Sequence, residues 1–171
     1  VSPSLNAFRV SPFDNVFEVE PNNDFAKATK TDTPVPAAFN GIISEPADID
    51  CFRFNAKKGQ SFHVRVHAQK IRSGLDPVLN VYDGKGKRIT GNDDSGGADS
   101  YLRFTPAADG EYLIHVTDHL KRGRPDFTYR VELTPYQKSY AMSIPHVSRR
   151  DSQSRQAMVV HKGNRFTTIM N

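Results

Sequence analysis

The sequence predicts an all-β fold, namely a jelly-roll-like antiparallel β-sandwich of about eight strands with an extra C-terminal segment. Two observations lead to this class: short runs in which apolar and polar residues alternate, and turn-forming residues between nearly all of these runs. A strand with one apolar and one polar face buries only one side, so two sheets packed face to face account for the pattern. The chain has 171 residues, of which 37% are hydrophobic and 25% are charged, which is sufficient for a core without disulfides.

The expected strands follow one another at short intervals along the chain. They cover Phe39–Ser44, Cys51–Asn55, Ser61–Ala68, Val78–Tyr82, Lys87–Thr90, Tyr101–Thr105, Glu111–Asp118 and Phe127–Thr134. The alternation is clearest at residues 62–67, where three apolar residues alternate with two histidines and an arginine. Glycine-containing turns at Lys58–Gly59, Asp83–Gly86, Asp94–Gly97 and Asp109–Gly110 separate the runs.

Composition shifts divide the chain into three parts. We expect residues 1–16 to be a linker or the end of an upstream domain, residues 17–136 to be the sandwich, and residues 137–171 to be a linker with the start of a further β domain or appended strands. The last 34 residues carry six basic side chains against one aspartate, a balance of +5, whereas the other 137 residues have a balance of −1. The sandwich therefore offers no basic stripe for nucleic acid, and no apolar run reaches the roughly 20 residues of a membrane helix.

Two acidic segments carry the main candidate site. Glu18, Glu20 and Asn22 lie two residues apart in a segment that Pro21 keeps extended, and Asp48 and Asp50 repeat the spacing beside a strand. Two such oxygen-rich edges, if the fold brings them together, suit calcium better than other common ions. The alternative is a solvated acidic segment with the two aspartates capping a turn.

Other features of the sequence offer less chemistry. The loop Asn92–Asp99 fails the EF-hand pattern, because the position that needs glutamate is Arg103. Cys51 is the single cysteine and is expected to be a semi-buried strand residue. The sequence contains no nucleophile elbow, phosphate-binding glycine loop or zinc-protease motif, so no motif in it points to a catalytic site.

Seven motifs in order resemble the bacterial pre-peptidase C-terminal domain, which is similar in fold to the collagen-binding module of bacterial collagenases. The resemblance covers about residues 17–134. The motifs are Glu18–Asn23, Asn40–Ile43, Asp48–Phe54, Lys58–Gln60, Asp76–Asp83, Gly91–Asp94 and Asp109–Val116. One departure is Cys51, where the family more often has tyrosine, which is expected to alter packing beside the site.

The resemblance implies a calcium site whose ligands are Glu18, Glu20, Asn22, Asp48 and Asp50, with Ser44 as a further oxygen donor. It also implies a noncatalytic module of a secreted, cell-surface or periplasmic multidomain protein that spaces its neighbouring domains or binds an extracellular protein or polysaccharide. Such a polymer would stack on tyrosines of the strand faces, for which the candidates are Tyr82, Tyr101 and Tyr129. The alternative is a fragment of a secreted hydrolase, a peptidase or glycosidase, whose catalytic site lies elsewhere or is completed upstream.

Overall fold

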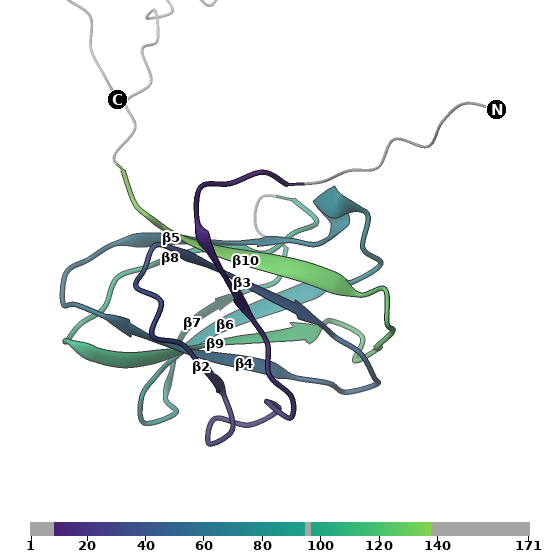
Figure 1. Cartoon of the computed structure of the whole chain (residues 1–171), viewed down its shortest axis with the longest axis horizontal. Coiled ribbons are helices and arrows are strands. Elements are labelled where there is room, and N and C mark those ends of the chain that lie inside the picture. The colour runs from purple at the N-terminus through teal and green to yellow at the C-terminus, as the bar shows by residue number, and fades with distance from the viewer. Residues whose placement is uncertain (1–8, 95–96, 138–171) are drawn as a thin grey trace, which may run out of the picture. The chain divides into compact units, whose positions relative to one another are not determined.

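The computed structural model describes residues 9–94 and 97–137, and these residues form two five-stranded sheets packed face to face (Figure 1). One sheet has the order β1 (Asp14–Phe17), β3 (Ala37–Ile42), β10 (Thr128–Pro135), β5 (Phe62–His67) and β8 (Tyr101–Phe104). The other has the order β2 (Thr29–Lys30), β4 (Asp50–Ala56), β9 (Gly110–Asp118), β6 (Pro77–Asp83) and β7 (Arg88–Asn92). A single turn of 3₁₀ helix, η1, spans Gln69–Ile71.

The predicted β-sandwich is confirmed, and all eight expected strands are present within one or two residues of their expected ends. Consecutive strands cross from one sheet to the other at every connection except the β6–β7 hairpin. Two short edge strands, β1 and β2, add to the prediction. They pair in parallel with β3 and β4, whereas the other pairings are antiparallel, so each sheet is mixed.

The start of the sandwich lies before the expected boundary at residue 17, because β1 begins at Asp14 and pairs with β3. A four-residue strand with one buried side chain, Val16, has too little alternation to be recognised from its own sequence. The chain divides into two units, residues 1–136 and 137–171. The prediction for the second unit falls almost entirely on residues outside the described ranges and stays a prediction.

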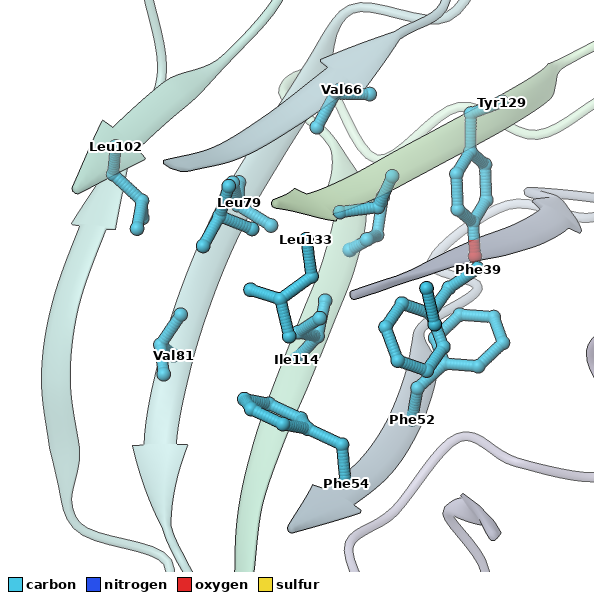
Figure 2. Close-up of a cluster of buried hydrophobic side chains, with 14 of the residues drawn as sticks. Phe39, Phe52, Phe54, Val66, Leu79, Val81, Leu102, Ile114, Tyr129 and Leu133 are labelled. Carbon is cyan, nitrogen blue, oxygen red and sulfur yellow. The ribbon is translucent and has the colours of Figure 1, made fainter. Parts of the chain in front are cut away.

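The core lies between the two sheets and consists of the inward-facing residues of both (Figure 2). Its centre is aromatic: the rings of Phe39 and Phe52, from opposite sheets, lie 5.3 Å apart between centroids, and Phe54 packs on Phe39 at 6.2 Å. Leu79, Ile114 and Leu133 fill the space beside them and are fully buried. Burying each such side chain contributes roughly 1.5–3 kcal/mol, so the described residues form a stable frame for the segments at its edges.

Candidate metal site

The site lies where the chain leaves β1, passes the edge of the sandwich and joins β2 on the other sheet. The backbone N–H of Glu18 donates to the carbonyl of Asn40 at 3.0 Å, which extends the pairing of β1 with β3 by one residue. The N–H of Val19 then donates to the hydroxyl of Thr29 in β2 at 3.0 Å. These two bonds fix both ends of the turn that carries Glu20 and Asn22.

A small apolar cluster holds the same segment against the outer face of the second sheet. Phe25 packs on Tyr82 with 4.7 Å between ring centroids, and Ala28 packs on Cys51 and Leu113. This contact positions the turn because Phe25 lies only five residues after Glu20. It also places Cys51 at 0% exposure under the segment, as a buried strand residue.

Three of the predicted metal ligands come together here. Carboxylate oxygens of Glu18, Glu20 and Asp50 all lie within 4.8 Å of one another. Asp50 is the first residue of β4 and is fully buried, and Glu18 is half-buried, so most of the group is shielded from water. The spacing singled these three residues out, and they meet because β1 ends and β4 begins at the same edge of the sandwich.

Each carboxylate of the cluster accepts at least one hydrogen bond that fixes its position. Oε1 of Glu18 accepts the backbone N–H of Ile42 at 3.0 Å, and Oε2 of Glu20 accepts the N–H of Asn22 at 2.8 Å. Oδ2 of Asp50 accepts the hydroxyl of Tyr129. Oε2 of Glu18 is buried and receives no ordinary hydrogen bond from the described residues. A buried carboxylate oxygen of this kind needs a proton or a cation beside it.

Asp48 lies beside the cluster, and its own oxygens are held by hydrogen bonds from neighbouring residues. Its Oδ2 accepts the N–H of Ser44 at 2.7 Å and the hydroxyl of Ser44 at 3.2 Å. Its Oδ1 accepts the N–H of Ile49 and the side-chain amide of Asn23 at 2.9 and 3.1 Å. The hydroxyl of Ser44 thus faces Asp48. Among the predicted ligands, the structure shows Ser44 as a group that orients a carboxylate.

Asn22 is fully buried, and its side-chain amide lies 3.4 Å from the hydroxyl of Thr29. This hydrogen bond joins the acidic turn to β2 in the second sheet.

Burial, together with repulsion between the carboxylates, disfavours the charged forms of Asp50 and Glu18. Burial raises the pKa of Asp50 to about 9, and the charges of Glu18 and Asp48 act in the same direction, against the hydrogen bond from Tyr129. Burial also raises the pKa of Glu18, although the neighbouring Asp50 carboxyl and the N–H of Ile42 act against burial. With no cation present, a proton on Asp50 can serve the unpaired oxygen of Glu18. A cation would take the place of that proton.

Sequence reasoning missed Gly41 and the role of Tyr129. A Cβ on Gly41 would overlap Oε2 of Glu18 and the hydroxyl of Tyr129, so glycine lets both groups lie against β3. Tyr129 is 2% exposed, and its ring lies in the core (Figure 2). The prediction that Tyr129 lines a polymer-binding surface is therefore wrong. Its period-two spacing from Val131 and Leu133 is the signal that indicates an inward side chain.

The other two predicted surface tyrosines keep part of their exposure. Tyr82 lies under Phe25 and beside His115, at 4.7 and 5.6 Å between centroids. Tyr101 lies on the outer face of the first sheet, with its hydroxyl 2.6 Å from Nδ1 of His63. For both residues, contact with a bound polymer stays a prediction.

Asp76, Asp93 and Asp94 form a second acidic group beside β6 and β7, and their oxygens also lie within 4.8 Å of one another. Nδ1 of His119 lies 2.8 Å from a carboxylate oxygen of Asp93. Asp94 borders residues 95–96, which lie outside the described ranges.

Comparison with known proteins shows which family and which solved structure the sandwich is similar to. Residues 48–118 match the family described as the bacterial pre-peptidase C-terminal domain. The matched range includes Asp48 and Asp50 but not β1 or the Glu18–Asn22 turn. A probable subtilase-type serine protease of Deinococcus radiodurans is 35% identical over 99 residues, which are 57% of this chain. This chain spans 14% of the length of that relative.

Among solved structures, the pre-peptidase C-terminal domain of a collagenase from Bacillus anthracis is similar over 68% of this chain and 100% of its own length. The TM-score is 0.50 and the sequence identity is 13%, so the similarity shows a shared fold. The family match confirms the resemblance over residues 48–118.

Proposed function

Residues 48–118 of this chain belong to the bacterial pre-peptidase C-terminal domain family, and from this premise we propose that the sandwich is a noncatalytic, calcium-stabilised accessory module of a secreted multidomain protein. In this role the module spaces neighbouring domains of the same protein. The observation that carries the proposal is the buried oxygen of Glu18, which faces a second buried carboxyl, that of Asp50, at the entrance to the sandwich.

The donor set fits calcium. The ligands are hard carboxylate oxygens from three residues, with further oxygen-bearing side chains behind them, and Ca²⁺ prefers six to eight oxygens. Glu18, Glu20 and Asp50 would hold the ion, with Asn22 and Asp48 next to them. Ser44 and Tyr129 would orient Asp48 and Asp50 through the hydrogen bonds they donate. The ion would supply the positive charge that this group of carboxylates lacks.

The mechanical consequence follows from where the three carboxylates come from. Glu18 and Glu20 belong to the segment that enters the sandwich, whereas Asp50 belongs to a central strand pair. A shared cation therefore joins the entry segment to the folded body and closes a loop of about thirty residues. A domain attached before this segment would be held at a defined angle when calcium is bound and released from it when calcium is removed.

A noncatalytic role agrees with the state of the cysteine. Burial raises the pKa of the Cys51 thiol to about 12, and the charges of Asp50 and Asp24 add to this effect. The thiolate that a cysteine nucleophile needs is therefore scarce at neutral pH. We propose that any peptidase activity of the whole protein, as the name of the Deinococcus relative suggests, resides in another domain.

We propose a location outside the cytoplasm, where free calcium is abundant enough to fill a site of moderate affinity. Along the described ranges, the structure has no helix with the length and apolar character to cross a membrane.

The proposal is tested by thermal unfolding of the purified chain in chelator and then over a calcium series, with magnesium as the ionic control. We expect calcium at 100 times its dissociation constant to add about 2.7 kcal/mol to the free energy of unfolding. Glu20→Gln should remove most of this gain because it removes one ligand charge. Glu45→Gln, at an exposed carboxylate in the loop before Asp48, should keep it.

An equal gain with magnesium, or a gain that survives Glu20→Gln, would contradict the assignment of the site. Turnover of a generic peptide substrate by the isolated chain would contradict the noncatalytic role.

A further inference from the structure

Five side chains form a continuous row on the outer face of the first sheet, far in sequence from the acidic cluster. His63 and Arg65 come from β5, Tyr101 and Arg103 come from β8, and Tyr136 follows β10. The imidazole of His63 lies between the two tyrosines, at 5.7 Å from the Tyr101 ring and 5.0 Å from the Tyr136 ring. β5 and β8 lie side by side at the edge of this sheet (Figure 1).

Each of the two arginines lies against a tyrosine ring of the row. The guanidinium carbon of Arg65 lies 4.8 Å from the centre of the Tyr101 ring, and that of Arg103 lies 3.7 Å from the centre of the Tyr136 ring. Contact with an aromatic ring restricts an arginine side chain and leaves its N–H donors free for an external acceptor. Contacts within the row therefore hold its two guanidiniums and three rings in place before any partner binds.

Neither arginine has an acidic partner among the described residues. Glu132 lies directly opposite Arg65 in the register of β10 with β5, but its oxygens accept from Arg9 and Arg130 at 2.6–3.0 Å. Arg65 and Arg103 are both exposed. Their charge is therefore available to a partner in solution.

The charge of the row comes from the two arginines alone at neutral pH. Burial lowers the pKa of His63, and the charges of Arg65 and Arg103 lower it further. The remaining neighbour of His63 across the sheet is the uncharged Thr134. The imidazole is therefore neutral, and its Nδ1 is engaged with the hydroxyl of Tyr101 at 2.6 Å.

We propose that this row binds an acidic polysaccharide, a carbohydrate chain that carries carboxylate or sulfate groups. Two separated and unpaired guanidiniums favour a partner with repeated anionic groups over a single small anion, and the planar guanidinium pairs with carboxylate and sulfate in the same forked geometry. The half-buried rings of Tyr101 and Tyr136 add aromatic surface against which sugar units can pack.

Two other occupants agree less well with the row. The segment 138–171 carries a balance of +5, so it would be repelled by Arg65 and Arg103. An acidic peptide would satisfy the two cations, but ordering its backbone loses conformational entropy at every residue. A carbohydrate chain, whose rings are rigid, loses less on lying across a sheet.

The test measures binding of the full chain to immobilised polygalacturonate and dextran sulfate, with neutral dextran as the matched polymer control. Chelator is present throughout, so the result does not depend on the calcium site. The variant Arg65→Gln/Arg103→Gln is compared with Arg88→Gln/Arg124→Gln, which removes the same charge from exposed arginines elsewhere. We expect the first pair to weaken binding about tenfold, and the second pair by less than about twofold because those arginines would make only long-range contributions.

The conservative pair Arg65→Lys/Arg103→Lys should give an intermediate loss, because it keeps the charge but not the forked donor geometry. Thermal unfolding of every variant shows whether the sandwich is intact. Equal losses in the two glutamine pairs would assign the binding to overall charge and the basic C-terminal segment, and would overturn the proposal. Tighter binding of poly-glutamate than of either polysaccharide would also overturn it, in favour of an acidic protein partner, and so would the absence of binding to both acidic polysaccharides.

Discussion

Replacement of Asp50 by asparagine should stabilise this protein in chelator and destabilise it, relative to wild type, in calcium. Asparagine has the shape of a protonated aspartate. Its carbonyl oxygen can accept the hydroxyl of Tyr129, and its amide can donate towards the unpaired oxygen of Glu18. The variant therefore supplies permanently what the wild-type site obtains from a proton when no cation is bound.

The size of the effect follows from the pKa of Asp50. The folded protein holds this pKa at about 9, against an ordinary value of 3.8. An acid with a raised folded pKa gives its full stability below pH 3.8, and that stability is lost as the pH rises towards 9. At pH 7 the loss has an upper limit of about 4 kcal/mol, and relaxation of the site reduces it. We expect asparagine to recover about 2 kcal/mol, or about 4–8 °C in melting temperature.

The assay is a set of thermal melts of wild type, Asp50→Asn and the control Glu45→Gln in chelator from pH 4 to pH 8, repeated in calcium. In chelator the gap between Asp50→Asn and wild type should be largest at pH 8 and close towards pH 4. Calcium should reverse the order at pH 7, since the ion binds the wild-type carboxylate more tightly. A variant less stable than wild type in chelator at pH 7, or a gap that does not change with pH, would refute the reasoning.

Three further predictions concern the surroundings of the site and the core. Gly41→Ala should lower the free energy of unfolding by about 1–3 kcal/mol and weaken calcium binding, because its methyl group overlaps Glu18 and Tyr129; a urea midpoint equal to that of wild type would contradict this. Burial alone would raise the pKa of Glu132, but hydrogen bonds from Arg9 and Arg130 outweigh burial and hold the pKa at about 2. The stability that Glu132 contributes is therefore lost as the pH falls towards 2, so Glu132→Gln should be less stable than wild type at pH 7 and nearly equal to it at pH 2; urea midpoints that differ equally at both values would speak against the ion pairs. Cys51, whose pKa burial raises to about 12, should resist alkylation at pH 8 until urea unfolds the chain, and rapid labelling of the folded protein would show that the segment around Phe25 does not cover it.

The sequence by itself determined the strands of the sandwich and the residue types of the candidate site. Alternation along a strand is a local property, so the eight strands from β3 to β10 could be recognised from runs such as Phe62–His67. Glu18, Glu20 and Asp50 could be singled out because period two in an extended chain fixes which side chains share a face. That these residues meet within 4.8 Å depends on the fold, which brings the two acidic segments together.

Only the tertiary structure decided how the groups of the site are partnered. The parallel pairing of β1 with β3 joins segments more than twenty residues apart, and so short a strand carries no pattern of its own. The same pairing leaves one oxygen of Glu18 unpaired in the interior, which no spacing could indicate. Tyr129 shows why the sequence could not decide this. A tyrosine ring with its hydroxyl suits a binding surface or a core equally well, and the packing of the two sheets buries this one with its hydroxyl on Asp50.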